Sequence, residues 1–370
     1  MRLLIAGGGT GGHLFPGLAL AEEVMRRDRA AEVLFVGTAR GLEAEVVPRE
    51  GFRLELIEQT GLKNVGALGA VRGLARLPRA LWQARRIVRR FRPDVTVGVG
   101  GYSSGPVVLA AALLGTPTAV LEQNAVPGFT NRVLARFVDA VLVNFDASAA
   151  HFPARKVRVI GNPVRRAVAE ADRGAAGAPA PARRKGEGEV RLLVLGGSQG
   201  ARALNENVPA AVAALPEALR ARVRVRHQSG KAEEEKVRDA YATLGLAAQA
   251  SVEPFIRAMA TAYATADLLV CRAGATTLAE LTAAARPSIL VPFPHAADDH
   301  QTANARAVAD AGGAVLLPQS ALTPARLAAE LSSLLDDPDR LAAMGAAART
   351  LARPDAAALA ADTLAALVRS

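Results

Sequence analysis

One histidine directly follows a glycine-rich turn near the start of the chain, where acid–base chemistry is plausible. Gly7, Gly9 and Gly12 fit the spacing G-x-G-x-x-G between an apolar run and an expected helix, and His13 comes next. In open α/β sheets ligands bind at such turns, beyond the strand ends. An imidazole with a pKa of roughly 6.5 accepts a proton at neutral pH. We predict that His13 is a general base. The alternative, a capping or core histidine, is weakened by the glycines around it.

Two later turns of small residues are suited to phosphate. The segment Gly196–Gly200 places backbone N–H groups and the Ser198 hydroxyl at an expected helix N-terminus. The segment Arg272–Glu280 again follows an apolar run, and its helix N-terminus could take a pyrophosphate. Glu280, about one and a half turns into that helix, could reach ribose hydroxyls. On residue chemistry alone, a solvated helix position is the better interpretation of Glu280.

Strands must position these turns, and short apolar runs alternate with helical segments through most of the chain. The expected buried strands are Arg2–Ala6, Glu32–Val36, Asp94–Val99, Thr118–Leu121, Ala140–Val143, Arg191–Leu195, Asp267–Cys271 and Pro287–Val291. This alternation predicts doubly wound parallel α/β sheets. The segment 191–200 repeats the pattern of 2–11, so we expect two similar domains in tandem. Residues 171–188, rich in Ala, Pro, Gly and Arg, read as a linker.

Composition limits the class of protein. The 370 residues suffice for two domains. The net charge of +10 suggests a polyanionic partner, which could be nucleic acid, an anionic membrane or a phosphorylated substrate. The single cysteine, Cys271, is expected to be a buried small hydrophobe. The charge-free stretch Val95–Leu121 is interrupted by glycine turns, which predicts strand, turn, helix and strand rather than a membrane span.

Taken together, seven motifs resemble the N-acetylglucosaminyltransferases of bacterial cell-wall synthesis, family 28 glycosyltransferases of GT-B architecture. The motifs are Gly8–Gly17, Gly100–Pro106, Glu122–Asn124, Gly161–Arg165, Gly196–Ala201, Cys271–Glu280 and Asp299–Ala305. The resemblance implies an α/β fold of two Rossmann-like domains whose parallel sheets face a deep cleft. It implies an acceptor- and membrane-binding domain over residues 1–162 and a donor-binding domain over 163–351, with a C-terminal helix over 352–370 packing back on the first.

The resemblance also implies the reaction. N-Acetylglucosamine would pass from UDP-N-acetylglucosamine to the 4-hydroxyl of undecaprenyl-linked lipid I with inversion, giving lipid II for peptidoglycan, with His13 as base. Matching positions assign to the donor Thr10, Gly11, Gly12, Asn124, Arg165, Ser198, Ile256, Ala275, Thr276, Thr277, Leu278, Ala279, Glu280 and Gln301. The acceptor side would use Gly101, Tyr102, Ser103 and Ser104. We expect neither cofactor nor metal, because helix N-termini and Arg165 can stabilise the leaving UDP.

A basic stretch is predicted to form a membrane-facing surface. Residues 71–92 contain eight arginines and no acid. On a helix beginning after Pro78, the residues Leu81, Ala84, Ile87, Val88 and Phe91 share one side, and Trp82 with Arg79, Arg86, Arg89 and Arg90 lies elsewhere. A solvated face is an equally good interpretation of such a charge run. An acceptor on a polyprenyl chain favours contact with an anionic membrane, at its cytoplasmic face and without a transmembrane segment.

Three rival classes remain for comparison. A nicotinamide oxidoreductase shares the first glycine turn but needs an acid near the end of the second strand, where Thr38 stands. A nucleic-acid-binding module accounts for the charge alone, because no reading motif is visible. Another GT-B enzyme or a UDP-N-acetylglucosamine 2-epimerase would share the donor site and differ in the first domain.

Overall fold

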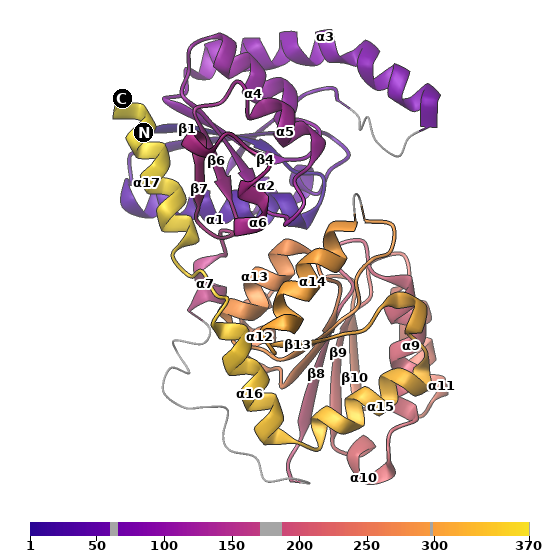
Figure 1. The fold of residues 1–370 in the computed structure, drawn as a ribbon. Coiled ribbons are helices and arrows are strands. Elements are labelled where there is room, and N and C mark those ends of the chain that lie inside the picture. The colour runs from indigo at the N-terminus through magenta and orange to yellow at the C-terminus, as the bar shows by residue number, and fades with distance from the viewer. Residues whose placement is uncertain (60–65, 171–186, 297–298, 370) are drawn as a thin grey trace. The chain divides into compact units, whose positions relative to one another are not determined.

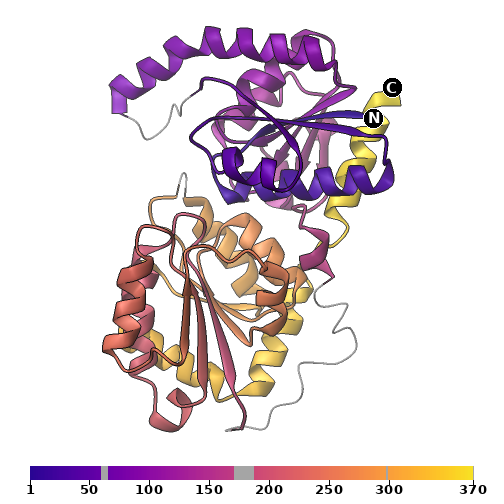
Figure 2. The ribbon, with the colours of Figure 1, turned by 180° about the vertical axis from the view of Figure 1, so that it is seen from behind.

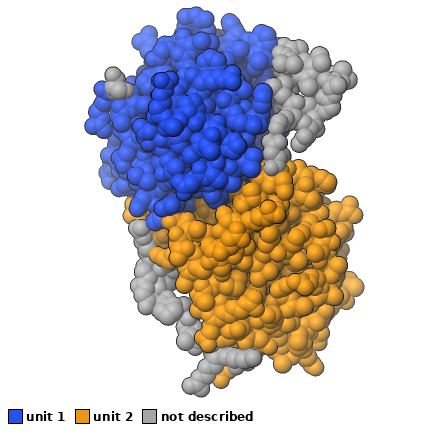
Figure 3. Space-filling view, viewed as in Figure 1, with its two compact units in different colours: residues 1–165, 353–370 blue, residues 166–352 orange. Residues whose placement is uncertain are grey.

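The chain forms two compact units, which are described separately. The computed structural model describes residues 1–59, 66–170, 187–296 and 299–369, and over residues 66–76 it describes the backbone alone. Unit 1 comprises Met1–Arg165 and Arg353–Ser370, and unit 2 comprises Arg166–Ala352 (Figure 3). The linker expected over residues 171–188 lies almost wholly outside the described residues.

Unit 1 contains a seven-stranded parallel sheet in the order β3-β2-β1-β4-β5-β6-β7 (Figure 1). Its strands are β1 (Arg2–Gly7), β2 (Glu32–Gly37), β3 (Arg53–Leu56), β4 (Val95–Gly100), β5 (Thr118–Glu122), β6 (Ala140–Val143) and β7 (Val157–Val159). Its helices are α1 (Gly11–Arg27), α2 (Glu43–Arg49), α3 (Gly66–Phe91), α4 (Ser104–Leu113), α5 (Phe129–Leu134), α6 (Asp146–Ala149), the 3-10 turn η1 (Ala154–Lys156) and α17 (Ala356–Arg369).

Alternating side chains of the central strand divide the core of unit 1 into two layers. Leu3 and Ile5 pack into a cluster with residues of α1 and α17. Leu4 and Ala6 point to the opposite face and pack with residues of α3 and α4. Because both faces are covered, the strands are apolar throughout, as in other parallel sheets.

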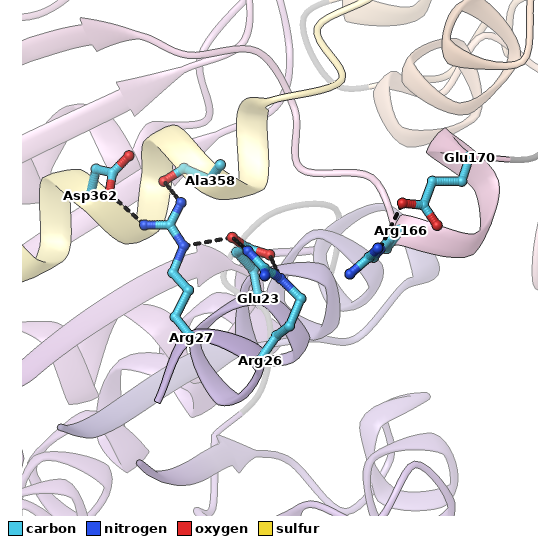
Figure 4. A network of polar contacts seen from close by, with 7 residues as sticks. All are labelled: Glu23, Arg26, Arg27, Arg166, Glu170, Ala358 and Asp362. Carbon is cyan, nitrogen blue, oxygen red and sulfur yellow. Dashed lines mark hydrogen bonds and ion pairs between the residues drawn. The ribbon is translucent and has the colours of Figure 1, made fainter. Parts of the chain in front are cut away.

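The C-terminal helix α17 lies beside α1 in both ribbon views (Figures 1 and 2). Arg27 of α1 joins the two helices, since its guanidinium contacts the Asp362 carboxylate and donates to the Ala358 carbonyl at 3.2 Å (Figure 4). The same guanidinium donates to Glu23 at 2.6 Å within α1. Ala360 and Leu364 complete the apolar layer beneath this polar contact. A segment distant in sequence is therefore part of the core of unit 1.

Unit 2 contains a six-stranded parallel sheet in the order β10-β9-β8-β11-β12-β13. Its strands are β8 (Val190–Leu195), β9 (Val223–Gln228), β10 (Ala250–Glu253), β11 (Leu268–Cys271), β12 (Ser288–Leu290) and β13 (Ala314–Leu316). Its helices are α7 (Arg166–Ala169), α9 (Arg202–Ala213), α10 (Glu217–Arg220), α11 (Glu234–Thr243), α12 (Met259–Thr265), α13 (Ala275–Ala283), α14 (His300–Asp310), the 3-10 turn η3 (Gln319–Ala321), α15 (Pro324–Leu335) and α16 (Pro338–Arg349).

The predicted fold class is confirmed: both units are doubly wound, all-parallel α/β structures. The eight expected strands are all present, and the charge-free stretch 95–121 forms β4, a turn, α4 and β5. Within the described parts of the chain, no helix combines the length and apolarity needed to cross a membrane. The expected start of the basic helix after Pro78 is wrong, because α3 already begins at Gly66. Pro78 lies inside this helix and is exposed.

A buried polar chain crosses unit 2 from α11 to α9. His227 of β9 lies between the Tyr241 hydroxyl, 3.0 Å from its Nδ1, and the Asn205 Oδ1, 3.1 Å from its Nε2. The Asn205 amide donates in turn to the Ser229 carbonyl at 2.9 Å. A side chain at Gly200 would overlap this carbonyl. The hydrogen-bonded row of Tyr241, His227 and Asn205 therefore holds the backbone against which the second glycine turn packs.

Burial makes His227 a source of pH-dependent stability. Desolvation lowers the pKa of His227 to about 4, whereas an unfolded histidine titrates near 6.5. Between these values the unfolded chain binds a proton that the native chain does not. This contribution to stability is therefore complete above pH 6.5 and is lost as the pH falls towards 4. It amounts to about 3 kcal/mol.

We predict that His227→Gln removes this dependence. The opening free energy of β9, measured by hydrogen exchange and corrected for intrinsic rates, should rise between pH 4.5 and 7 in the wild type and be nearly flat in the variant. The matched control is His151→Gln, at an exposed histidine of unit 1, and should keep the wild-type slope. An unchanged slope in His227→Gln would show that the imidazole does not carry the effect.

Candidate functional site

Each sheet has one point at which the strand order reverses, and the predicted motifs lie there. In unit 1 the chain runs outward from β1 to β3 and then returns to place β4 on the other side of β1. Unit 2 repeats this between β8 and β11. Ligands of open α/β sheets bind beyond the carboxyl ends of strands at such points. The turns 7–12 and 100–104 leave β1 and β4, and the turns 196–200 and 272–274 leave β8 and β11.

The two turns of unit 1 pack backbone against backbone. A Cβ at Gly7 would overlap the Gly100 carbonyl, and one at Gly101 would overlap the backbone of Gly8. The Gly8 N–H donates to the Gly100 carbonyl at 3.2 Å. Gly7 and Gly101 have positive φ angles of 148° and 85°, which glycine adopts without strain. The glycines are therefore needed for the close packing of the two turns, whether or not a ligand binds there.

A buried carboxylate, which the motif analysis missed, completes the first turn. Glu43 of α2 is 1% exposed. Its Oε2 accepts from the Gly9 N–H at 2.6 Å, and its Oε1 accepts from the Thr38 N–H at 2.8 Å and from the Thr38 hydroxyl at 3.0 Å. Side chains at Gly8 or Gly41 would overlap this carboxylate. The sequence signal is a glutamate two residues after a glycine that follows the second strand.

Glu43 also bears on the nicotinamide alternative. An acid does follow the second strand, five residues beyond its expected position at Thr38. However, its carboxylate points into the protein and is bound to the turn, so it is not placed to hold a ribose at the surface. A negative charge inside the turn also opposes a phosphate at the Gly9 N–H.

His13 lies in the first turn of α1 and is partly buried. Its ring covers Gly100, where any Cβ would press against the imidazole Cδ2. Its Nδ1 lies 3.4 Å from the hydroxyl of Thr10, the residue that precedes α1. The structure thus brings together His13, Thr10 and both turns of unit 1. The ring is held by contacts at the surface of the two turns and not by packing in an apolar core.

The four residues expected on the acceptor side divide into two pairs. Gly101 is partly exposed and Tyr102 is exposed. Ser103 and Ser104 are buried, and the Ser103 hydroxyl donates to the Val36 carbonyl at 3.0 Å. The Ser103 side chain therefore holds the turn and the Ser104 side chain is enclosed, while Gly101 and Tyr102 form the surface of the turn.

Asn124 is held by an internal carboxylate. Glu122, buried at the end of β5, accepts from the Asn124 N–H at 3.0 Å and from its side-chain amide at 3.3 Å. The second Glu122 oxygen accepts from the Gly128 N–H at 3.0 Å and from the Asn131 amide at 2.9 Å. The motif Glu122–Asn124 does not by itself indicate this role of Glu122. It fixes the loop that presents Asn124.

Arg165 differs most from expectation, because it lies in unit 1 and is already paired. Its guanidinium binds Glu22 at 2.9 Å and Glu50 at 2.8 Å. Burial raises the pKa of Glu22 even though Arg165 beside it acts in the opposite direction. The expected donor-binding domain beginning at residue 163 does not match unit 2, which begins at Arg166. Arg165 is therefore engaged by two carboxylates of unit 1.

In unit 2, four loops bring the remaining candidates to the carboxyl edge of the sheet. Ser198 follows β8, Ile256 follows β10, the segment 275–280 follows β11 and Gln301 follows β12. Gln228, which the motif analysis missed, connects two of these loops. Its amide donates to the Gly197 carbonyl at 2.9 Å, and its Oε1 accepts from the Ile256 N–H at 2.9 Å. The Ile256 N–H is therefore used within the protein, and the Ile256 carbonyl is the backbone group that could accept a hydrogen bond from a nucleobase.

The helix α13 begins at Ala275 with Gly274 as its N-cap, so its first N–H groups face the switch point. The expectation of a solvated Glu280 is wrong. Glu280 is 9% exposed, and the hydroxyl of the buried Tyr263 donates to its Oε2 at 3.0 Å. Gln301 accepts from the Phe293 N–H at 3.0 Å and thereby holds the loop after β12. Among the described residues, no group of three or more His, Cys, Asp or Glu could hold a metal ion.

Comparison with known proteins gives a family. The model of the glycosyltransferase family 28 N-terminal domain matches residues 3–143, and that of the C-terminal domain matches residues 191–360. A protein of Anaeromyxobacter sp. (strain Fw109-5) is 54% identical over 370 residues, covering 100% of this chain and 94% of that protein. A protein of Geobacter sulfurreducens is 46% identical over 369 residues, covering 100% and 99%. Both are named UDP-N-acetylglucosamine--N-acetylmuramyl-(pentapeptide) pyrophosphoryl-undecaprenol N-acetylglucosamine transferase.

Solved structures agree with this assignment. The crystal structure of Acinetobacter baumannii MurG has a TM-score of 0.74 and 33% identity, covering 99% of each chain. A UDP-GlcNAc 2-epimerase from Neisseria meningitidis, bound to UDP-GlcNAc, has a TM-score of 0.66 and 11% identity, covering 99% of this chain and 100% of that one. At that identity the epimerase is similar in fold alone. The resemblance inferred from the seven motifs is confirmed.

We predict that the buried carboxylate of Glu43 stabilises unit 1 strongly. Glu43→Ala strips three buried donors of their acceptor and leaves a cavity, so unfolding should become easier by about 3 kcal/mol. Urea unfolding followed by fluorescence of Trp82, the chain's only tryptophan, reports on unit 1.

The control is Glu45→Ala on the same helix, where the side chain is exposed and pairs with Arg49. It should change stability by less than about 0.5 kcal/mol. Equal effects of the two substitutions would contradict the role assigned to Glu43.

Proposed function

The chain belongs to glycosyltransferase family 28, and we propose that it transfers N-acetylglucosamine from UDP-N-acetylglucosamine to undecaprenyl-pyrophosphoryl-N-acetylmuramoyl-pentapeptide. This reaction converts lipid I into lipid II, a precursor of peptidoglycan. The observation that carries the proposal is the 54% identity, along the whole chain, to a transferase with that name.

The electrostatics of the two glycine turns support a donor site in unit 2. In unit 1 the turn is closed from inside by the Glu43 carboxylate, which repels phosphate. In unit 2 the corresponding turn is closed by the Gln228 amide, which carries no charge. A pyrophosphate is therefore better accommodated by the turn at Ser198 and the N-terminus of α13, where helix N–H groups and the dipole favour an anion.

The remaining donor contacts follow from the chemistry of each group. The Ile256 carbonyl would accept from the uracil N3–H, and the Glu280 carboxylate from ribose hydroxyls. Gln301 is a further donor contact in unit 2. In unit 1, Thr10, Gly11, Gly12, Asn124 and Arg165 remain proposed donor contacts, although Glu22 and Glu50 compete with a nucleotide for Arg165.

The chemical step is an inverting displacement. The acceptor 4-hydroxyl oxygen forms a bond to the anomeric carbon while the bond from that carbon to the UDP oxygen breaks. His13 takes the hydroxyl proton, and Thr10 supports the other ring nitrogen. The developing charge on UDP is stabilised by the N-terminus of α13 and by Ser198. Gly101 and Tyr102 are the surface residues through which the turn after β4 would meet the acceptor.

The direct test is product formation. The full-length chain, given UDP-N-acetylglucosamine and a short-chain lipid I analogue, should release UDP and form a β-linked disaccharide in equal amounts. Release of UDP without disaccharide, or formation of the 2-epimer from the donor alone, would contradict the proposal.

We predict that His13→Ala lowers kcat by roughly 10²–10⁴-fold, the usual contribution of a general base. Because His13 is placed at the acceptor hydroxyl, the KM for UDP-N-acetylglucosamine should stay within about twofold. His151→Ala, at the exposed histidine of unit 1, is the control and should be fully active. Wild-type turnover in His13→Ala would remove His13 as the base.

A peripheral membrane contact through α3 is the second part of the proposal. Trp82 is 62% exposed, and Arg79, Arg86, Arg89 and Arg90 are exposed, while Ala84, Ile87, Val88 and Phe91 are buried. The Arg86 guanidinium lies 5.8 Å from the centre of the Trp82 ring. Arg79 pairs with Glu58 and Arg90 with Glu55, so the positive field is smaller than the count of arginines suggests.

Elements packed in series next to α3 also expose apolar side chains. The helix α4 packs against α3, and α5 packs against α4. Leu113 at the end of α4 is exposed, as are Val133 of α5 and Phe137 just beyond it. Exposed apolar side chains together with arginines are suited to the interfacial region of an anionic bilayer. A cytoplasmic-face location follows from the substrates proposed above, since the nucleotide sugar is a cytoplasmic metabolite in this reaction.

We predict that changing Arg79, Arg86, Arg89 and Arg90 to Gln weakens binding to phosphatidylglycerol-containing vesicles at least tenfold, since each basic group near such a surface contributes about 1 kcal/mol. Co-sedimentation with phosphatidylcholine vesicles, with and without phosphatidylglycerol, measures the effect. The control carries the same charge change on exposed arginines of unit 2, namely Arg202, Arg238, Arg326 and Arg340. Equal loss in both variants would mean that net charge, and not this face, drives binding.

A further inference from the structure

A buried tyrosine holds the carboxylate that the proposed function assigns to ribose. Tyr263 of α12 is completely buried, and its hydroxyl donates to Glu280 Oε2 of α13 at 3.0 Å. Glu280 is 9% exposed. The two side chains come from consecutive helices that lie on either side of β11 in the sequence.

In this pair the Tyr263 hydroxyl is the donor and the Glu280 carboxylate is the acceptor. Burial, followed by the charge of Glu280, raises the pKa of Tyr263 well above its ordinary value. The phenol therefore keeps its proton and acts as a donor at every physiological pH. A buried carboxylate is costly unless it accepts hydrogen bonds, so Glu280 gains from keeping this contact. An ionised carboxylate can accept several hydrogen bonds, and Tyr263 supplies one of them to Glu280.

The contact restricts a side chain that otherwise has several rotatable bonds. A glutamate on a helix can place its carboxylate in many positions, and fixing it costs conformational entropy. In this chain the Tyr263 hydroxyl anchors one oxygen before any ligand binds. The other oxygen then has a defined direction, which is what recognition of a vicinal diol needs. Preorganisation of this kind improves affinity by reducing the cost of ordering.

Tyr263 also connects this carboxylate to the base-reading loop. The segment from Pro254 to Ala258 contains Ile256 and leads directly into α12. The Ile256 N–H is fixed by Gln228, and four residues after the start of α12 the Tyr263 ring enters the core. One continuous segment thus places the carbonyl offered to the base and the donor that orients Glu280.

We propose that Tyr263 is a positioning residue that orients Glu280 toward the ribose 2′- and 3′-hydroxyls and so gives the enzyme its preference for ribonucleotide over deoxyribonucleotide donors. The proposal rests on the donor site described under the proposed function and adds a determinant of sugar specificity to it. Tyr263 contacts no substrate; it acts through Glu280.

The test compares affinities for UDP and 2′-deoxy-UDP in the full-length chain by isothermal titration calorimetry. The wild type should bind UDP more tightly. Tyr263→Phe removes one oxygen, and should weaken UDP binding about tenfold, as expected for loss of a hydrogen bond to a charged group. Binding of 2′-deoxy-UDP should weaken by a clearly smaller factor, because this nucleotide keeps the 3′-hydroxyl alone. With UDP-N-acetylglucosamine as substrate, KM should rise by the same factor and kcat should change little.

The matched control is Tyr241→Phe, the same chemical change at another buried tyrosine of unit 2. Its hydroxyl contacts His227 and not Glu280. The ratio of the two affinities should stay at its wild-type value in this variant. If Tyr263→Phe weakens both nucleotides equally, or neither, Tyr263 has a structural role alone and the proposal is overturned.

A double substitution keeps the test decisive if Tyr263→Phe folds poorly because it removes the hydrogen bond from the phenol to Glu280. In Glu280→Gln the charge is absent, so adding Tyr263→Phe should change UDP affinity by less than about twofold. A further tenfold loss in the double variant would show that Tyr263 does not act through Glu280. If Glu280→Gln itself keeps the full ribose preference, the assignment of Glu280 to ribose fails. If the wild type does not bind UDP, the donor site of the proposed function fails.

Discussion

The Glu43 carboxylate, fully enclosed in unit 1, determines the form of the first glycine turn. It accepts three hydrogen bonds from the turn and from the residue after β2. A side chain at Gly8, Gly37 or Gly41 would overlap Glu43, so glycine is required at these positions. Removing the charge would leave backbone donors without partners in a place that water does not reach. The position of α1, and with it His13, depends on this turn. The glycines of the motif are thus explained as much by an internal anion as by a bound one.

The two units solve the same geometric problem with different chemistry. Each sheet has a switch point at which a glycine turn meets the loop of a neighbouring strand. In unit 1 the internal partner is a carboxylate, and in unit 2 it is the neutral amide of Gln228, supported by the buried chain of His227 and Asn205. Repetition of a sequence motif therefore does not imply repetition of a ligand. A buried carboxylate beside a turn opposes the binding of phosphate there, whereas a neutral amide does not.

Much of this could be predicted from the sequence, because the strongest signals are local. Continuous apolar runs predicted the central strands except β9, in which arginines alternate with apolar residues. Helical periodicity predicted most of the buried face of α3. Edge strands such as β3 and β7 were missed because their residues are few and partly exposed. The partners of Glu43, Glu122 and Arg165 were missed for a different reason. A buried carboxylate has no periodic pattern, and its donors lie up to 143 residues away in the chain, as for Arg165 and Glu22. Resemblance to a family identified ligand residues, but not the residues that hold them.

The contribution of α17 to unit 1 has a consequence for the order of folding. Unit 1 consists of the first and last segments of the chain, and unit 2 occupies the sequence between them. During synthesis the residues that line the α17 side of the first sheet leave the ribosome long before Ala360 and Leu364 do. Unit 2 can therefore complete its core while unit 1 still exposes part of its own. An apolar strip on a nascent chain is a natural target for a chaperone until α17 covers it.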